Sequence, residues 1–186
     1  MLIDVILIAV AAVLIGVYVS WRAGRLDRMH TRLEAAQAAL DVNLVRRSSV
    51  ALELASSGLL DPATSLLLAE AAHNARGGPS SELAQSNLSR ALRAAFAQPG
   101  FRASLTGKDG ADELLAEVEA AAQQVFVART FYNNAVAVTR EARGKPLVRL
   151  LRLAGNAGLP EFFEMDDSLV AEGGDGAGAS MQRLAG

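Results

Sequence analysis

The sequence predicts an all-α protein in which an N-terminal transmembrane helix continues into an antiparallel four-helix-type bundle, with a disordered C-terminal tail. Three observations predict it. An apolar run opens the chain, apolar residues repeat every three and four positions through its middle, and the end is acidic, rich in Gly and free of aromatic residues. We divide the chain into an anchor (1–21), a bundle (22–164) and a tail (165–186).

The anchor extends from Leu2 to Trp21, and its central run Val5–Val19 is apolar throughout. About 20 residues at about 1.5 Å rise each match a hydrocarbon core of about 30 Å. The residues before the run include Asp4 but no Lys or Arg, and no Ala-x-Ala follows it. We therefore predict a retained anchor and not a cleaved signal peptide, with Asp4 solvated at the membrane edge.

Basic residues crowd the C-terminal flank of the anchor: Arg22, Arg25, Arg28 and Arg32. The positive-inside rule predicts that this flank is cytoplasmic and that the short N-terminus lies outside, leaving about 165 residues in the cytoplasm. The four arginines would also attract anionic lipid, at about 1 kcal/mol each. Ala12, Gly16 and Ser20 place small residues on one helix face, which allows a homo-oligomer through close helix packing.

Composition argues against several kinds of function. The 186 residues include no Cys, which excludes disulfides and thiolate metal sites, and the net charge of −2 gives no basic footprint for nucleic acid. Neither His30 nor His73 has a second His at metal-ligand spacing, so we expect solvent-facing roles for both. No nucleotide-binding fingerprint or activated nucleophile is present, and we predict no cofactor, no metal and no enzymatic activity.

The first bundle helix is predicted to continue from the anchor to Ser56–Gly58, because no Pro or Gly interrupts Leu26–Ser57. Its apolar seam is Leu26, Met29, Leu33, Ala36 and Leu40. Arg46 and Arg47 lie late on this helix. We expect them to face solvent or to pair with acids, with phosphate binding as the alternative.

Two shorter helices should follow. Asp61 and Pro62 give an N-cap and a first helical residue, and the second helix is predicted to end near Asn74, before Gly77-Gly78-Pro79. Ser80 or Ser81 should cap the third helix, which ends at Gln98-Pro99-Gly100. Residues 101–110 are predicted to form a loop.

The last long helix is predicted to be capped by Asp109 and to end at Gly144 and Pro146. A short helix, 147–153, should follow it. The apolar seam of the last long helix consists of these residues: Leu115, Val118, Ala122, Val125, Arg129, Tyr132 and Val136.

The charged residue in this seam, Arg129, marks the most unusual site. Arg129, Tyr132 and Asn133 share one side of the helix at i, i+3 and i+4. In the structural interpretation, Tyr132 and Asn133 hydrogen-bond a neighbouring loop, and Arg129 pairs with an acid of the first helix; the candidate acids are Glu34, Asp41 and Glu53. The alternative is a pocket for a small ligand or lipid.

These residues resemble the LemA family of bacterial membrane proteins. The resemblance rests on Leu44-Val45-Arg46-Arg47, on Ala128–Val136 with Arg129, Tyr132 and Asn133, and on Leu159–Glu164 with Phe163 and Glu164, and it covers most of residues 1–165. The chain differs at Ser48–Glu53, which lacks the Asp and the Pro-Asn of the family, and at Thr139-Arg140, where a second Tyr-Asn often stands. The resemblance implies a bundle anchored in the bacterial inner membrane, without an established enzymatic activity.

The sequence therefore favours a structural or interaction protein, single-pass in the membrane, with unknown protein partners. A ligand-binding or lipid-binding module around Arg129 is the alternative, and a hydrolase has the least support. The sequence does not name what the bundle binds.

Overall fold

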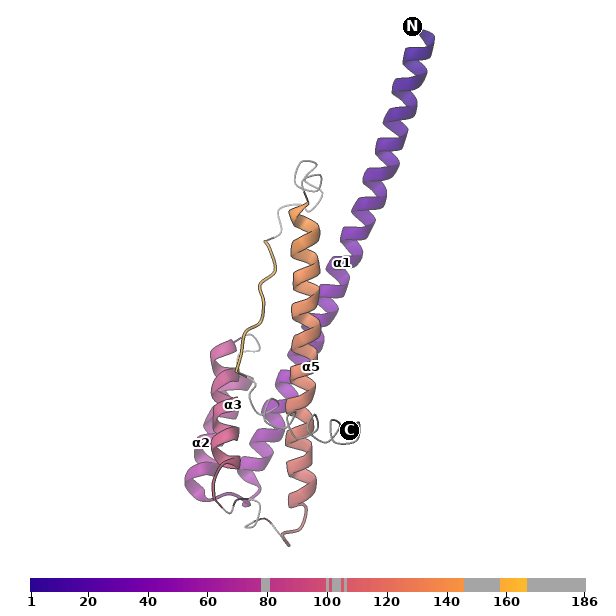
Figure 1. Cartoon of the computed structure of the whole chain (residues 1–186). Coiled ribbons are helices and arrows are strands. Elements are labelled where there is room, and N and C mark those ends of the chain that lie inside the picture. Colours follow the sequence, from indigo (N-terminus) through magenta and orange to yellow (C-terminus); the bar gives the residue numbers. More distant parts are fainter. Residues whose placement is uncertain (78–80, 100, 102–104, 106, 146–157, 167–186) are drawn as a thin grey trace, which may run out of the picture. The chain divides into compact units, whose positions relative to one another are not determined.

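The computed structural model consists of α-helices wherever regular structure is described (Figure 1). It describes residues 1–77, 81–99, 101, 105, 107–145 and 158–166, apart from the side chains of Val19, Arg22, Ala23 and Leu26. The helices with defined bounds are α1 (Leu2–Ser56), α2 (Pro62–Arg76), α3 (Glu82–Phe96) and α5 (Ala111–Gly144). The all-α prediction is confirmed for these residues.

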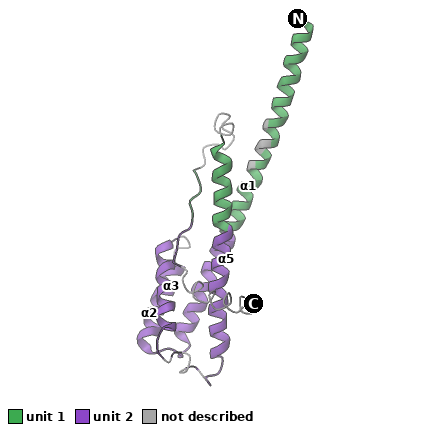
Figure 2. Cartoon of the chain, viewed as in Figure 1, with its two compact units in different colours: residues 1–37, 132–162 green, residues 38–131, 163–186 purple. Residues whose placement is uncertain are grey.

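The chain divides into two compact units (Figure 2). Unit 1 contains residues 1–37 and 132–162, and unit 2 contains residues 38–131 and 163–186. Helices α1 and α5 each contribute to both units.

Helix α1 runs from Leu2 to Ser56 without a break, as the absence of Pro predicted. Met29, Leu33 and Ala36 are half-buried and Leu40 is buried, so the predicted seam is confirmed at these positions. After the helix ends, Gly58 has a φ of 74°, a left-handed conformation that Gly adopts without steric cost.

Helices α2 and α3 pack against each other, and side chains cap their N-termini. Asp61 accepts hydrogen bonds from the amides of Ala63 and Thr64, both at 3.1 Å, and Pro62 is the first helical residue, as predicted. The hydrogen bonds from Thr64 are the main cause that lowers the pKa of Asp61. Helix α2 ends at Arg76, two residues later than predicted, and Gly77 caps it.

Of the two serines proposed to cap the third helix, Ser81 does so. Its hydroxyl accepts from the amide of Ala84 at 3.2 Å. Helix α3 then ends at Phe96 and is capped by Ala97, the residue before the predicted Gln98-Pro99-Gly100 break.

The predicted loop 101–110 needs correction, because Phe101 and Leu105 are helical and buried. The ring of Phe101 lies 5.4 Å from the ring of Phe96, so a short apolar connection packs into the bundle where turn residues suggested an exposed loop. Gly110, with a φ of 73°, directly precedes α5, and its carbonyl accepts from the amide of Leu114 at 3.1 Å. The start of α5 at Ala111 therefore places Gly110, and not Asp109, at the N-cap.

Unit 2 is a helical bundle with one apolar core. The core collects buried residues of α1, α2, α3 and the first half of α5, among them Leu54, Leu68, Leu88 and Val118, together with Phe101 and Leu105.

On α5 the predicted seam is confirmed, since Leu115, Val118, Ala122, Val125 and Val136 are all buried. The helix ends at Gly144, as predicted.

Residues 158–166 have no regular secondary structure. Met165 is buried and Asp166 is half-buried, so defined packing continues two residues past the predicted start of the tail. The rest of the predicted tail, 167–186, and the predicted helix 147–153 lie outside the described residues.

The N-terminal part of α1 exposes its apolar side chains. From Leu2 to Val17 every Leu, Ile and Val is between 52 % (Val10) and 80 % (Leu2) exposed. Within the part of the chain that the structure describes, no helix combines the length and the apolarity needed to cross a bilayer.

Candidate functional site

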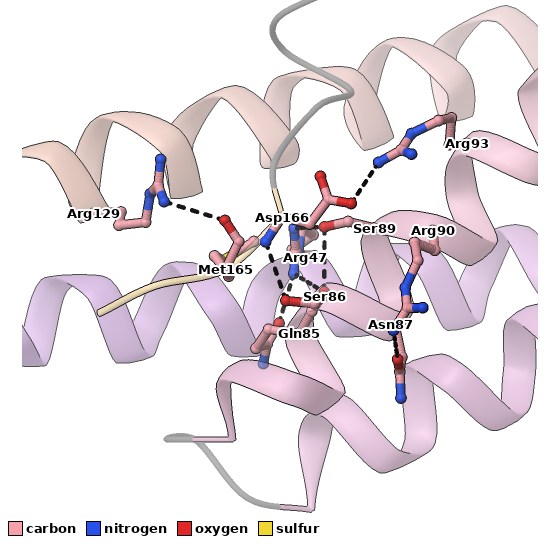
Figure 3. A network of polar contacts seen from close by, with 10 residues as sticks. All are labelled: Arg47, Gln85, Ser86, Asn87, Ser89, Arg90, Arg93, Arg129, Met165 and Asp166. Atoms are coloured by element: carbon pink, nitrogen blue, oxygen red, sulfur yellow. Dashed lines mark hydrogen bonds and ion pairs between the residues drawn. The ribbon is translucent and has the colours of Figure 1, made fainter. Parts of the chain in front are cut away.

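The most developed polar arrangement in unit 2 surrounds Arg47 (Figure 3). The Arg47 side chain is almost completely buried, and its guanidinium donates to Oε1 of Gln85 at 2.7 Å, to the Gln85 carbonyl at 3.1 Å and to the hydroxyl of Ser89 at 3.0 Å. Gln85 in turn donates from Nε2 to the carbonyl of Ala75 at 3.0 Å. One arginine of α1 therefore connects α3 directly, and α2 through Gln85.

Arg47 does not face solvent, so that expectation is wrong. The expected alternative was an ion pair with an acid, whereas the acceptors described here, Ser89 and Gln85, are neutral. A sequence signal for its burial exists. The seam of α1 continues from Leu40 in steps of four and three through Leu44, Arg47, Ala51 and Leu54, all of which are buried. Burial also makes Arg47 inaccessible to a phosphate ligand from solvent.

The neighbouring Arg46 behaves as expected. It is exposed, donates to Oε1 of Gln124 at 2.8 Å and lies 3.6 Å from the carboxylate of Glu117. An exposed ion pair of this kind contributes only about 0–1 kcal/mol. The two adjacent arginines thus have different roles, because a step of one residue rotates a side chain by about 100° around the helix.

The C-terminal segment adds a second layer of polar contacts to unit 2. The carboxylate of Asp166 lies 2.9 Å from the guanidinium of Arg93, and the Asp166 amide donates to the hydroxyl of Ser86 at 3.1 Å. Figure 3 shows Asp166 between the Arg47 group and Arg93. None of these residues except Arg47 was a candidate from the sequence, because nothing local links position 166 to α3.

Arg129 also contacts this segment. It donates to the backbone carbonyl of Met165 at 3.2 Å, a partner that the predicted acids of the first helix did not include. Of those acids, Asp41 is half-buried, and burial raises the pKa of its carboxyl group. The Met165 carbonyl thus accepts a hydrogen bond from Arg129, which lies in the otherwise apolar seam of α5.

The two terminal motif residues lie next to each other but differ in burial. Phe163 is buried, whereas the Glu164 side chain is exposed and its amide donates to the carboxylate of Glu82 at 2.9 Å. The segment 163–166 is therefore held by side chains of α3 and α5.

In unit 1 the hydroxyl of Tyr132 donates to the carbonyl of Glu161 at 3.0 Å, which confirms the predicted bond from Tyr132 to a neighbouring connection. Asn133 is half-buried and has a polar or charged interaction of its own.

A buried arginine of unit 1 was not expected from the sequence. Arg143 donates to the carbonyl of Gly158 at 2.7 Å, and its second terminal nitrogen lies 2.9 Å from Nε2 of His30. His30 is half-buried, so its predicted solvent-facing role is wrong, whereas His73 is exposed as predicted. Of the flanking arginines, Arg25, Arg28 and Arg32 are exposed, and the side chain of Arg22 lies outside the described residues.

A cavity of about 380 Å³ lies in unit 2 between the end of α1 and the connection before α5. Lys108 lines it and donates to the carbonyl of Leu59 at 3.3 Å, while Asp61 at its edge is occupied as a helix cap. These two polar groups of the lining therefore already contact the chain itself. Among the described residues, no group of three His, Asp or Glu side chains could hold a metal ion.

Comparison with protein-family models, with curated proteins and with solved structures finds no match to this chain.

Proposed function

We propose that this protein is a helical bundle anchored in the bacterial cytoplasmic membrane, with the bundle in the cytoplasm and a structural or interaction role. The observation that carries the proposal is the exposed apolar surface of α1 from Leu2 to Val17. Burying one such Leu, Ile or Val side chain is favourable by about 1.5–3 kcal/mol relative to leaving it in water. A helix that exposes a whole series of them is therefore suited to an apolar environment.

The length of the apolar run in the sequence supports the span itself. The continuously described part of the segment stops at Tyr18, whereas the sequence continues it through Val19 to Trp21. Exposed Arg25, Arg28 and Arg32 follow at once, where the positive-inside rule places the cytoplasmic boundary.

The bundle supports an interaction role more than a catalytic one. Arg47, Arg93 and Arg129 all bind groups of the chain itself. Such contacts favour a structural role for these arginines over a catalytic one. The ligand site around Arg129 has less support than it had from the sequence, because one terminal nitrogen of that guanidinium already donates to the Met165 carbonyl. The LemA resemblance, with its anchored bundle, fits this proposal and remains part of it.

Fractionation of cells that express the full chain tests the anchor. We expect the protein in the membrane fraction, resistant to high salt and alkaline extraction and released by detergent. Val10→Arg together with Leu14→Arg should move it to the soluble fraction, because each charge at the centre of a span costs roughly 2.5–3.5 kcal/mol. The matched control, Val10→Phe with Leu14→Phe, should stay in the membrane.

A C-terminal alkaline phosphatase fusion tests the orientation. We expect no phosphatase activity, since the enzyme is inactive in a reducing cytoplasm, and an active fusion would contradict the proposed topology. Wild-type protein that is soluble without detergent would contradict the anchor.

A further inference from the structure

One face of α1 in unit 2 is apolar and exposed. Ala38, Val42 and Val45 are all exposed, and Val42 has 68 % of its surface accessible. At about 100° per residue, these side chains point away from the buried Leu40 and Leu44 on the same helix. This face therefore lies outside the packing of α1 in its own bundle.

Helix α5 extends the exposed face. Arg46 donates to Gln124 at 2.8 Å, which places α1 and α5 side by side at this level. Val127 and Phe131 follow Gln124 by three and seven positions, so they share its side of α5. Val127 is 41 % exposed and Phe131 is 67 % exposed. We call the apolar surface formed by these side chains the outer face: Ala38, Val42, Val45, Val127 and Phe131.

The exposed residues of α1 follow a heptad repeat. In the sequence, the steps of three and four that join Ala38, Val42 and Val45 continue backwards through Ala35 and Thr31. Both of these residues are exposed, and α1 has no break at any of these positions. Ala35 and Val42 then occupy the a positions of a coiled coil, and Thr31, Ala38 and Val45 occupy the d positions.

Charges of opposite sign border this heptad on its two sides. Position g holds Asp27, Glu34 and Asp41, whereas position e holds Arg32 and Arg46. Asp27 and Asp41 each precede an arginine by five residues, the separation at which g of one helix meets e of a second, parallel helix. In an antiparallel pair g would meet g, and acids would face acids. The charges of α1 are therefore complementary to a parallel copy of α1.

The surroundings of Asp41 also favour a cation from a second copy. Asp41 is half-buried, burial raises the pKa of its carboxyl group, and no described residue of its own chain forms an ion pair with it. The arginine at the matching e position, Arg46, lies 3.6 Å from Glu117, but 47 % of its side chain is accessible. Arg46 of a second copy can therefore supply the cation that Asp41 lacks.

We propose that the outer face is the interface of a parallel homodimer, in which the acids at g of each copy pair with the arginines at e of the other. The inference rests on the membrane anchor of the proposed function, because two copies inserted in the same direction meet with their α1 helices parallel. Confinement to one membrane also raises the effective concentration of the copies.

Single cysteines test the dimer, because the native chain contains none. Full chains with Ala38→Cys, at a d position, are expressed, and isolated membranes are oxidised with copper phenanthroline. We expect a disulfide-linked dimer on a non-reducing gel. The matched control is Gln37→Cys, the exposed neighbour at position c, which should give a band about fivefold weaker because c side chains lie outside the seam. Equal bands would indicate random collision and would overturn the dimer.

Charge reversal tests the register. In the Ala38→Cys chain, Asp27→Arg should weaken the dimer band about fivefold, because it turns two ion pairs into repulsions. Adding Arg32→Asp restores opposite signs at g and e and should restore the band. A band that does not respond to Asp27→Arg would contradict the pairing, and a disulfide to a different protein in place of the dimer would assign the face to another partner.

Fractionation of the same samples separates this inference from the anchor. Chains found in the soluble fraction contradict the anchor, and the comparison of Ala38→Cys with Gln37→Cys on that fraction then decides the dimer. Chains that stay in the membrane without the disulfide contradict only the dimer.

Discussion

The Oε1 atom of Gln85 lies 2.7 Å from Nη2 of Arg47, and the amide nitrogen of the same Gln85 side chain donates to the carbonyl of Ala75 at 3.0 Å. Both side chains are nearly inaccessible to solvent. A buried guanidinium is costly unless its donors are bonded, and a buried amide needs partners at both ends. The hydrogen bond between them therefore lowers the cost of burying both side chains. Together the two residues connect α1 to α3 and α2.

Arg47→Met should destabilise unit 2 by about 3 kcal/mol, because it leaves the buried acceptors of Gln85 and Ser89 without their donor. Urea unfolding of the detergent-solubilised protein, followed by far-ultraviolet circular dichroism, measures the loss. Arg46→Met is the matched control and should cost at most about 1 kcal/mol, because Arg46 is exposed. Equal losses for the two variants would contradict the structural role assigned to Arg47.

Phe163→Ala should release the C-terminal segment, because removing a buried Phe side chain costs about 3 kcal/mol or more. Hydrogen exchange measures the effect at the amides of Glu164 and Asp166, which should exchange much faster than in the wild type. The adjacent Phe162 is partly exposed, and the guanidinium of Arg140 lies 5.1 Å from its ring centroid. Phe162→Ala should leave both amides protected, and faster exchange in that variant alone would contradict the assignment.

His30→Lys should lower the thermal stability of unit 1. Arginine only donates, so Nε2 of His30 accepts and the ring carries its proton on Nδ1. A lysine would place a second cation beside Arg143 and remove the acceptor, at a cost of roughly 1–3 kcal/mol. His73→Lys is the control at an exposed histidine and should leave the melting temperature unchanged. Identical melting curves for the two variants would argue against the contact.

Asp61→Asn should remove one acid-dependent component of stability. Hydrogen bonds from Thr64 and Ala63 lower the pKa of Asp61 in the folded protein. The stabilisation is therefore complete above the ordinary pKa of 3.8 and is lost as the pH falls through the lower, folded value. Asn caps helices as well as Asp does, so stability near pH 7 should change little. Unfolding measured from about pH 6 down to about pH 2 should show a flatter profile for the variant, and an unchanged slope would count against the cap.

Helix ends and helix faces could be predicted from the sequence because their causes are local. Asp61 with Pro62, Ser81 and the Gly144 stop act within one turn of the residues they cap. The seams of α1 and α5 follow from the 3.6-residue period, and Arg47 lies on the α1 seam although its identity suggested solvent. The sequence also predicted that Tyr132 hydrogen-bonds a neighbouring connection, as it does at Glu161.

The partners of the arginines could not be predicted, because each pairing joins residues far apart in the chain. Asp166 meets Arg93 across 73 positions and His30 meets Arg143 across 113. Local patterns also gave the wrong prediction for Phe101 and Leu105. The turn residues around them suggested a loop, whereas both side chains are buried in the core of unit 2.

The sequence by itself determined the all-α class, the approximate positions of the four long helices and the apolar N-terminal run, since capping, periodicity and hydropathy are properties of short segments. The tertiary structure decided which of the adjacent residues Arg46 and Arg47 is buried, and that Met165 and Asp166 bind the bundle. The physical reason is that burial depends on which helix covers a face. That neighbour comes from elsewhere in the chain, so only the packed structure supplies it.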